Sequence, residues 1–261
     1  MDPVRPEFVP DPGASHEEMV AQQRALVESA RFEDDRSFDP DEVGIAEPIE
    51  LEEHAASAAP SAPIVVGIDQ AFLEDEGVSA AVAIQGDRVI EVACGRTPLE
   101  IPYIPGLLAF REGGPILAAL ANLSVDPDLL VLDGQGRIHY RQAGIATHVG
   151  VVLDVPAIGI AKNLLCGRPE RSLDTHLEAG TRVRILADDE VEAPPDTLLG
   201  YALQTRQFPD PERRHVNPVF VSPGHRVSPG TAVALAESLS AGYKLPEPVR
   251  LADRAATECK D

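Results

Sequence analysis

Tryptophan is absent from the sequence, aromatic residues make up only 4% of it, and there are three cysteines. Cys94, Cys166 and Cys259 lie far apart and are odd in number, which argues against a disulfide framework and against a clustered cysteine metal site. We expect them to be small hydrophobic residues or surface thiols. No run of about 18 apolar residues occurs, and the first residues are not a basic segment followed by an apolar one, as in a signal peptide. These absences predict a soluble, cytoplasmic protein without a membrane partner.

Lysine is also scarce, since only Lys162, Lys244 and Lys260 occur among the 22 basic residues. Against them stand 43 Asp and Glu, and the formal net charge is −21. Acid enrichment with lysine depletion is typical of proteins that work in concentrated salt, where exposed charges are screened and acidic side chains keep the surface hydrated. The alternative interpretation is an ordinary acidic protein with acidic arms.

A strongly negative chain would normally not bind nucleic acid, because affinity for phosphates comes largely from Lys and Arg. The charge is, however, unevenly placed. Residues 1–62 hold 16 Asp and Glu against 4 Arg, a net of −12, whereas residues 101–170 hold 6 acids against 5 bases. The middle of the chain is therefore nearly neutral, and a nucleic-acid partner there is not excluded.

The length allows one sizeable hydrophobic core, and the composition divides the chain into two parts. Residues 1–62 are predicted to be an acidic N-terminal extension with one helix near residues 15–29, where Ser15 can cap the helix and Glu18 follows three residues on. Residues 38–63 are typical of a flexible connection. Residues 63–261 are predicted to form the globular domain.

Hydrophobic patterning in the globular part predicts alternating strands and helices. Strands are expected at residues 64–72, 78–84, 87–95, 128–133, 157–161, 182–186, 198–203 and 219–222, and helices at 113–123, 143–153 and, as the last helix, 229–241. Three antiparallel strands that lead into a helix and a buried strand match an α/β fold of the RNase H-like class. We expect a mixed sheet, three antiparallel strands followed by parallel strands, flanked by helices.

Two of these strands carry an acidic residue where an apolar residue would be expected. Asp69 lies in the strand at 64–72, and Asp133 ends the strand at 128–133. A carboxylate at a strand end points into the crevice where open α/β sheets bind ligands. Mg²⁺ prefers one or two carboxylates plus water and phosphate oxygens, so this pair suits phosphodiester hydrolysis. The alternative for each residue is a structural role in a turn or a helix cap.

Three sequence segments resemble the endonuclease V family: IPYIPGLLAFRE at 101–112, the long segment from VLDGQG to NLLCG at 131–167, and NPVFVSPGHRVS at 217–228. The resemblance extends over residues 63–253. It implies that Asp69 and Asp133 bind the metal directly and that Glu112 completes the acidic cluster. The implied metal is Mg²⁺, with Mn²⁺ as an alternative.

The resemblance also implies three catalytic basic residues. Lys162 matches the catalytic lysine of the family and would contact the phosphate or the transition state. His225 and His139 match family histidines near the metal and the substrate phosphates, since imidazole can bind a cation, orient water or donate to phosphate. The alternatives are a solubilising lysine and histidines that only form surface hydrogen bonds.

For recognition, the resemblance implies a wedge and a pocket. The wedge is a stiff loop tip that enters the duplex beside the lesion, formed by Pro102, Tyr103, Ile104 and Pro105. The pocket receives the flipped base and is lined by Gly106, Leu108, Gly134, Gly136, Gly144, Ile145 and Leu165. Glycines there let backbone groups approach the base, although they also suit tight turns.

The implied activity is cleavage of DNA that contains deoxyinosine, at the second phosphodiester bond 3′ to the lesion, to give 3′-hydroxyl and 5′-phosphate ends. An alternative keeps the chemistry but takes inosine in single-stranded RNA. Two further alternatives are a non-catalytic inosine-binding protein and an acidic interaction protein built around the N-terminal extension. We expect a monomer.

Overall fold

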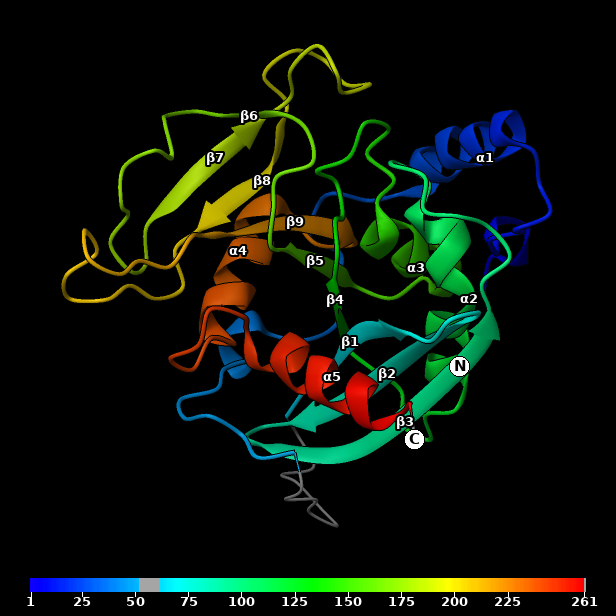
Figure 1. Ribbon diagram of the computed structural model, residues 1–261, viewed down its shortest axis with the longest axis horizontal. Helices are drawn as coiled ribbons and strands as arrows, with labels where there is room; N and C mark the ends of the chain where they lie inside the picture. Colours follow the sequence, from blue (N-terminus) through cyan, green and yellow to red (C-terminus); the bar gives the residue numbers. More distant parts are fainter. Residues whose placement is uncertain (52–61, 261) are drawn as a thin grey trace.

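The computed structural model describes residues 1–51 and 62–260 (Figure 1). The described strands form one nine-stranded sheet in the order β3-β2-β1-β4-β5-β9-β8-β7-β6. The strands are β1 (Ile64–Phe72), β2 (Glu76–Gln85), β3 (Arg88–Pro98), β4 (Leu129–Asp133), β5 (Ala157–Ala161), β6 (Arg168–Pro169), β7 (Arg182–Leu186), β8 (Leu198–Leu203) and β9 (Val219–His225). The helices are α1 (His16–Ser29), α2 (Leu108–Ala121), α3 (Ile145–Leu153), α4 (Pro229–Ser238) and α5 (Glu247–Glu258), with short 3-10 turns at Pro6–Phe8 and Pro40–Glu42.

The predicted α/β class and mixed sheet are confirmed. Strands β1 to β3 are antiparallel, β4 and β5 run parallel to β1, and β9 returns antiparallel to β5. Parallel alignment brings the carboxyl ends of β1, β4 and β5 to the same edge of the sheet. The predicted strands lie in these positions, except that β6 was not predicted and β9 continues to His225 instead of ending at 222.

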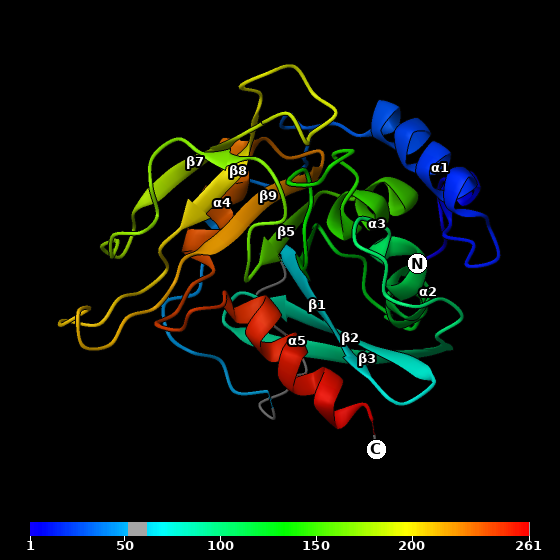
Figure 2. The same ribbon diagram turned by 45° about the horizontal axis from the view of Figure 1, so that its top comes forward.

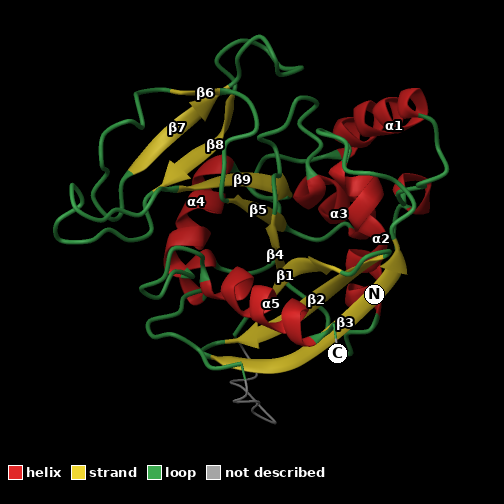
Figure 3. Cartoon of the chain, in the orientation of Figure 1, coloured by secondary structure: helices red, strands yellow, loops and turns green. Residues whose placement is uncertain are grey.

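The helices cover both faces of the sheet (Figures 2 and 3). Side chains alternate along β1, so that Val65 packs with α4 and α5 whereas Val66 and Ile68 pack with α2 and α3. Burial on both faces explains why β1, β4 and β5 are almost continuously apolar. The acid of β1, Asp69, follows the last residue that pairs with β4, and the acid of β4, Asp133, is the last residue of its strand.

Two helix predictions were wrong. Helix α2 begins at Leu108, not at 113, and Pro115 lies inside it. Proline is better tolerated near a helix start than in the interior, where it removes a backbone hydrogen bond, and a start at residue 113 would have placed Pro115 there. The helix instead continues through Pro115, because the burial of Ile116 and Leu120 stabilises it. The prediction of a last helix at 229–241 missed α5, whose two prolines, Pro246 and Pro248, lie at its start, where proline is tolerated.

Helix α5 lies directly on β1. A Cβ atom at Gly67 would come within 1.9 Å of the Pro248 carbonyl oxygen, so only glycine allows this approach. The buried face of α5 includes Val249, Ala252 and Ala256. The close approach fixes the position of α5 over the carboxyl end of β1.

The N-terminal residues pack onto the core. The capping box of Ser15 and Glu18 at α1 is present, as predicted. The prediction of a flexible connection at 38–63 was wrong for residues 38–51, because Phe38, Ile45 and Leu51 are buried in the core cluster of α4 and α5. The rest of that prediction, residues 52–61, lies outside the described residues. The division into an extension (1–62) and a domain (63–261) stays a prediction.

Cys94 in β3 and Cys259 after α5 form a disulfide, with their Cα atoms 6.0 Å apart. The expectation of small hydrophobic residues or free thiols was therefore wrong for these two. They are 165 residues apart in sequence, but α5 folds back over β1 and β2 and brings them together. Cys166 does behave as a small hydrophobic residue, since burial raises the pKa of its thiol to about 12. In the described ranges, no helix is both long enough and apolar enough to cross a bilayer.

Candidate active site

Three predicted acidic residues meet at the carboxyl ends of β1 and β4. The register pairs Ile68 with Leu132, so Asp69 and Asp133 are the next residues of adjacent parallel strands. Glu112 on α2 is buried, and the negative charge of Asp133 acts on it. We call Asp69, Glu112, Asp133 and Lys162 the carboxylate cluster.

Two acids of this cluster, Asp69 and Glu112, are held in an environment that favours their neutral form. Burial raises the pKa of Asp69 to about 8, and the negative charge of Asp133 adds to the shift, whereas the backbone N–H of Gln70 opposes it. Burial likewise raises the pKa of Glu112 to about 7, with a contribution from Asp133 and an opposing effect of Arg111. Two buried acids with raised pKa values beside a third acid are typical of functional sites.

Lys162 supplies positive charge to the cluster. It follows β5, and its Nζ donates to Asp133 Oδ2 at 2.7 Å. Burial acts to lower the pKa of Lys162, but the hydrogen bond and charge of Asp133, with the charge of Asp69, raise it above its ordinary value. Lys162 therefore carries its charge at neutral pH, beside the acids.

Sequence reasoning missed Asp253, which lies on α5 and acts on both Asp69 and Lys162. A hydrogen bond with the Asp253 carboxyl adds to the raised pKa of Asp69, and the charge of Asp253 contributes to the raised pKa of Lys162. Asp253 is exposed, although its neighbours Ala252 and Ala256 are buried. The signal that could have found it was a helical apolar pattern after Pro248, with one acid beside the buried face.

The donor set suits a hard divalent cation. In residues 1–51 and 62–260, no three Asp, Glu, His or Cys side chains converge closely enough to form a ready metal cage. Mg²⁺ uses only one or two carboxylates and completes its octahedron with water and phosphate oxygens. The protein therefore needs to supply only some of the six oxygen ligands. Such an ion would offset the burial and the repulsion from Asp133 that raise the pKa of Asp69, and would favour its ionised form.

A pocket of about 340 Å³ opens beside the carboxylate cluster and shares Asp133 and Lys162 with it. Of the predicted recognition residues, the lining includes Tyr103, Gly106, Leu108, Gly134, Gly144, Ile145 and Leu165. Ala109, Gln135, Ala143, Ala161, Asn163 and Leu164 also line it and were not predicted. The volume is within the range of pockets that bind small ligands.

Gly134 shows why the pocket wall needs glycine. Its φ is +148°, and a Cβ atom there would lie 2.4 Å from the Cγ2 atom of Ile145. A side chain would therefore both strain the backbone and fill the pocket. Gly136 was predicted to line the pocket but lies behind it, where its N–H donates to Ser222 Oγ at 2.9 Å.

The predicted wedge is a loop at the pocket mouth. Tyr103 is 63% exposed and lines the pocket edge, and Pro102 and Pro105 are exposed beside it. Ile104 is partly buried and packs with Met19 and Phe110, so the loop is fixed from below by α1 and α2. An exposed aromatic on a fixed loop can stack against a base.

His139 braces the pocket wall. Its Nδ1 accepts from the N–H groups of Arg141 and Ala143 at 3.2 and 3.4 Å, so its Nε2 carries the proton and donates to the Gly106 carbonyl at 3.1 Å. Burial lowers the pKa of His139 to about 4, with a smaller contribution from Arg141. A neutral, fully engaged imidazole positions the pocket wall.

The Gly106 carbonyl also accepts a hydrogen bond from the N-terminal region, a connection that sequence reasoning missed. Gln23 of α1 is fully buried and donates to Gly106 O at 2.9 Å, and Arg141 donates to the same oxygen at 3.2 Å. Gln23 in turn accepts from Arg141 at 2.7 Å. Helix α1 is therefore part of the support of the pocket; the signal was a glutamine on the apolar face of a helix.

His225 was predicted to lie near the metal, and the structure does not place it there. Because β9 runs antiparallel to β5, Phe220 pairs with Ala161 at the carboxyl end of β5, and His225 pairs with Ala157 at the opposite end. His225 is completely buried. Its Nδ1 accepts from the Arg31 N–H at 3.2 Å, and its Nε2 donates to Asp154 Oδ1 at 3.0 Å.

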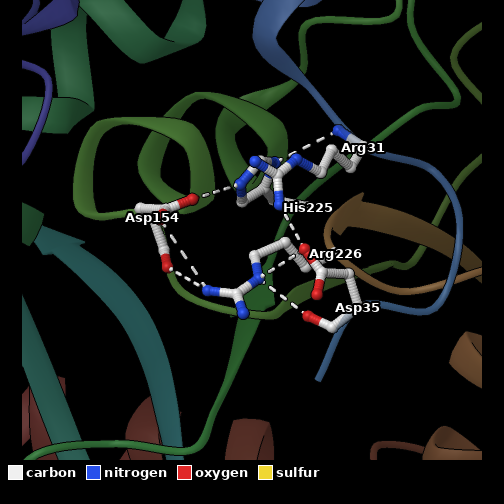
Figure 4. A network of polar contacts seen from close by, with 5 residues as sticks. All are labelled: Arg31, Asp35, Asp154, His225 and Arg226. Atoms are coloured by element: carbon white, nitrogen blue, oxygen red, sulfur yellow. Dashed lines mark hydrogen bonds and ion pairs between the residues drawn. The ribbon is translucent and has the colours of Figure 1, made fainter. Parts of the chain in front are cut away.

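Figure 4 shows the surroundings of His225, which we call the histidine network: Arg31, Asp35, Asp154, His225 and Arg226. Arg226 donates to the backbone oxygens of Asp35 and Asp154 at 2.7 and 2.9 Å, and Arg31 pairs with Asp35. Burial lowers the pKa of His225, although Asp154 opposes the shift. This network holds the N-terminal region against β9 and α3.

Comparisons with known proteins agree with this geometry. The sequence profile of the family described as Endonuclease V matches residues 45–254. Endonuclease V of Halobacterium salinarum is 56% identical over 259 residues, covering 98% of both chains, and that of Haloarcula marismortui is 54% identical, covering 99% of this chain and 97% of the relative. Both relatives come from halophilic archaea.

Solved structures of endonuclease V share the fold. That of Streptomyces avermitilis is 32% identical with a TM-score of 0.73, covering 98% of this chain and 96% of that one. The Ciona intestinalis protein, in complex with DNA that contains an inosine followed by a ribo-adenosine, has a TM-score of 0.67 at 21% identity, covering 93% and 95%. The chain belongs to the endonuclease V family, whose members are nucleases that hydrolyse phosphodiester bonds.

Proposed function

We propose that this enzyme cuts DNA at deoxyinosine, hydrolysing the second phosphodiester bond 3′ to the lesion and leaving 3′-hydroxyl and 5′-phosphate ends. The observation that carries the proposal is that Asp133 and Lys162 belong both to the carboxylate cluster and to the lining of the pocket. A nucleotide whose base occupies the pocket would therefore place its sugar–phosphate backbone beside the acids. Enzymes that act at one base take it out of the stack into such a pocket.

Recognition would rest on backbone groups and on Tyr103. The glycines of the pocket, Gly106, Gly134 and Gly144, expose backbone polar groups to the edge of a flipped base. Three donors, from Gln23, His139 and Arg141, hold the Gly106 carbonyl and so fix this part of the wall. Tyr103 at the mouth would stack where the base was removed.

Catalysis would rest on the carboxylate cluster. A bound Mg²⁺, with Mn²⁺ as an alternative, would be held by Asp69 and Asp133, with Glu112 and Asp253 nearby, and would supply Lewis acidity at the phosphoryl oxygens. Lys162 would place a permanent positive charge where the phosphoryl group gains negative charge. Asp133 positions Lys162 through their 2.7 Å hydrogen bond.

The acidic composition and the halobacterial relatives together support work in concentrated salt. At about 1 M salt the Debye length is near 3 Å, so repulsion between the acidic surface and nucleic acid is largely screened. Affinity would then come from cation bridging, stacking and hydrogen bonds in the pocket. We expect the enzyme to stay folded and active in molar KCl.

The test is incubation of end-labelled DNA with a single deoxyinosine, in a KCl series with Mg²⁺, with Mn²⁺ or with a chelator. The matched substrates are the adenosine duplex and an RNA strand with inosine. We expect one nick, at the second bond 3′ to deoxyinosine, that requires the cation. Faster cutting of the RNA would assign the enzyme to RNA, and inosine binding without any nick would make it a binding protein.

A further inference from the structure

A second groove, of about 570 Å³, lies outside the pocket and the carboxylate cluster. We call it the cationic groove; its lining residues are Arg206, Phe208, Arg214, His215, Val216, Asn217 and Lys244. It is formed by the β8–β9 connection and the α4–α5 connection, which lie on the same side of the molecule, coloured yellow-orange and orange-red in Figure 1. Neither segment belongs to the predicted site.

The groove has a fixed backbone. Gln204 is buried and donates to the carbonyl oxygens of Arg206 and Val216, both at 2.7 Å. Gln207 accepts from the N–H groups of Phe208 and Val216, both at 3.0 Å. Thr205 donates to the Lys244 carbonyl at 2.7 Å and so joins the two connections. The charged side chains therefore project from a braced scaffold.

The cations of the groove are available for a ligand. The guanidinium groups of Arg206 and Arg214 lie over the Phe208 ring, 4.9 and 4.2 Å from its centroid. In the part of the chain that the structure describes, Arg206, Arg214 and Lys244 form no ion pair, whereas Arg24, Arg182 and Arg250 each pair with a glutamate. Glu212 on the same loop faces His176, at 3.8 Å. Three cations that line one groove without an ion pair among the described residues are therefore free to bind an anionic ligand.

Lys244 of the cationic groove lies near Lys162 of the active site. Burial lowers the pKa of Lys244, and the positive charge of Lys162 contributes, so the two ammonium groups lie close enough to repel each other. Lys162 lines the pocket and binds Asp133. Lys162 at the pocket and Lys244 at the cationic groove are therefore near each other, and the connection that carries Lys244 leads directly into α5, which carries Asp253.

We propose that the cationic groove binds the sugar–phosphate backbone of the substrate strand on the 3′ side of the bond that is cut. This rests on the proposed function. With the lesion base in the pocket and the second 3′ bond at Asp133 and Lys162, the strand leaves the active site past Lys162, toward Lys244. Arginines held over an aromatic ring suit this ligand, because guanidinium groups bind phosphates and the ring can stack with a base.

The test compares the double variant Arg206→Ala/Arg214→Ala with Arg88→Ala, which removes an exposed arginine at the other end of the sheet. Binding is measured by fluorescence anisotropy in a chelator, across a KCl series, with two deoxyinosine strands. One strand has a long 3′ arm, and the other ends just after the cleavage position. Melting temperatures check that each variant is folded.

We expect the wild type and Arg88→Ala to bind the long strand more tightly and with a steeper salt dependence than the short one. The double variant should bind both alike. Its slope of log affinity against log salt on the long strand should fall by about 0.7 to 0.9 for each phosphate that it no longer neutralises. Phe208→Leu, which keeps an apolar side chain, should lose part of the same preference.

If the folded double variant keeps the wild-type preference for the long 3′ arm, the groove assignment is overturned. Nicking at deoxyinosine, and with it the proposed function, would still stand after that result. If the wild type instead prefers a long 5′ arm and the double variant loses that preference, the strand runs in the opposite direction and the assignment of the groove to the 3′ side is overturned. A wild type that neither binds nor cuts deoxyinosine strands would remove the proposed function and this inference together.

Discussion

The carboxylate cluster and the histidine network lie at opposite ends of β4 and β5 and are built from similar residues. In the histidine network, two arginines face two aspartates, and every group drawn in Figure 4 has a partner. In the carboxylate cluster, Asp69, Glu112 and Asp133 face a single lysine, and the pKa values of Asp69 and Glu112 are raised. One cluster has matched acids and bases, and the other has more acids than bases.

The difference separates a structural role from a functional one. Buried charges that are paired and hydrogen-bonded hold a fold together, and removing one partner leaves the other unpaired. Buried acids that repel each other destabilise the fold until a cation arrives, so their retention indicates a function. Substitutions in the carboxylate cluster should therefore lower activity, and substitutions in the histidine network should lower stability.

The largest effect is expected for Asp133→Asn in the carboxylate cluster. Nicking should fall by at least about 10³-fold, since even changes outside the direct ligands of a metal commonly cost 10- to 100-fold. In a chelator the variant should unfold at the same temperature as the wild type or higher, because repulsion with Asp69 is removed. Single-turnover nicking and thermal unfolding are the measurements. Nicking within tenfold of wild type would take Asp133 out of the metal site.

Lys162→Ala should slow the chemical step by about 10² to 10³, the range found when one group that stabilises developing charge is removed. Affinity for deoxyinosine DNA should change less, because the charge matters most in the transition state. Single-turnover rates at saturating enzyme, beside dissociation constants, separate the two effects. Equal losses in both, on every DNA tested, would indicate ordinary phosphate binding.

Tyr103→Ala should weaken discrimination between deoxyinosine DNA and normal DNA by about 1–3 kcal/mol, the cost of losing one stacking aromatic. The residue is 63% exposed, so the fold should not change. Competition binding with the two duplexes measures the ratio, and Tyr103→Phe, which keeps the ring, serves as the control. Unchanged discrimination in Tyr103→Ala would contradict the wedge assignment.

His225→Ala should leave the single-turnover rate unchanged but lower the free energy of unfolding by about 1–3 kcal/mol, because the Arg31 N–H and Asp154 lose their buried partner. Urea unfolding and nicking at low temperature measure both quantities. A folded variant that has lost nicking would return His225 to the catalytic residues and break the comparison between the clusters.

The smallest effect concerns pH in the histidine network. Burial lowers the pKa of His225 below its ordinary 6.5. As pH falls, His225 is therefore protonated in the unfolded chain before it is protonated in the folded protein. The stability that neutral His225 contributes is complete above pH 6.5 and is lost as pH falls through the lowered value. The difference in unfolding free energy between wild type and His225→Ala should shrink below pH 6.5, by at most about 1.4 kcal/mol per pH unit. A constant difference from pH 7 to pH 5 would contradict it.

Much of the fold could be predicted because it depends on local patterns. Apolar, β-branched-rich runs bounded by turn residues located β1 to β5 closely, and a carboxylate within an apolar strand identified Asp69 and Asp133. Helix α5 was not predicted, since its prolines hid its start, and Asp253 was missed with it. The disulfide between Cys94 and Cys259 depends on the same helix folding back over the sheet.

The sequence by itself determined most of the strands and helices, where acids interrupt apolar runs, and which family the long central segment resembles. Only the tertiary structure decided which polar residues meet. His225 lies away from the acids because β9 runs antiparallel to β5, and Gln23 reaches the pocket because α1 packs against the Gly106 loop. Such proximity depends on strand direction and on packing between distant segments, which no local pattern contains.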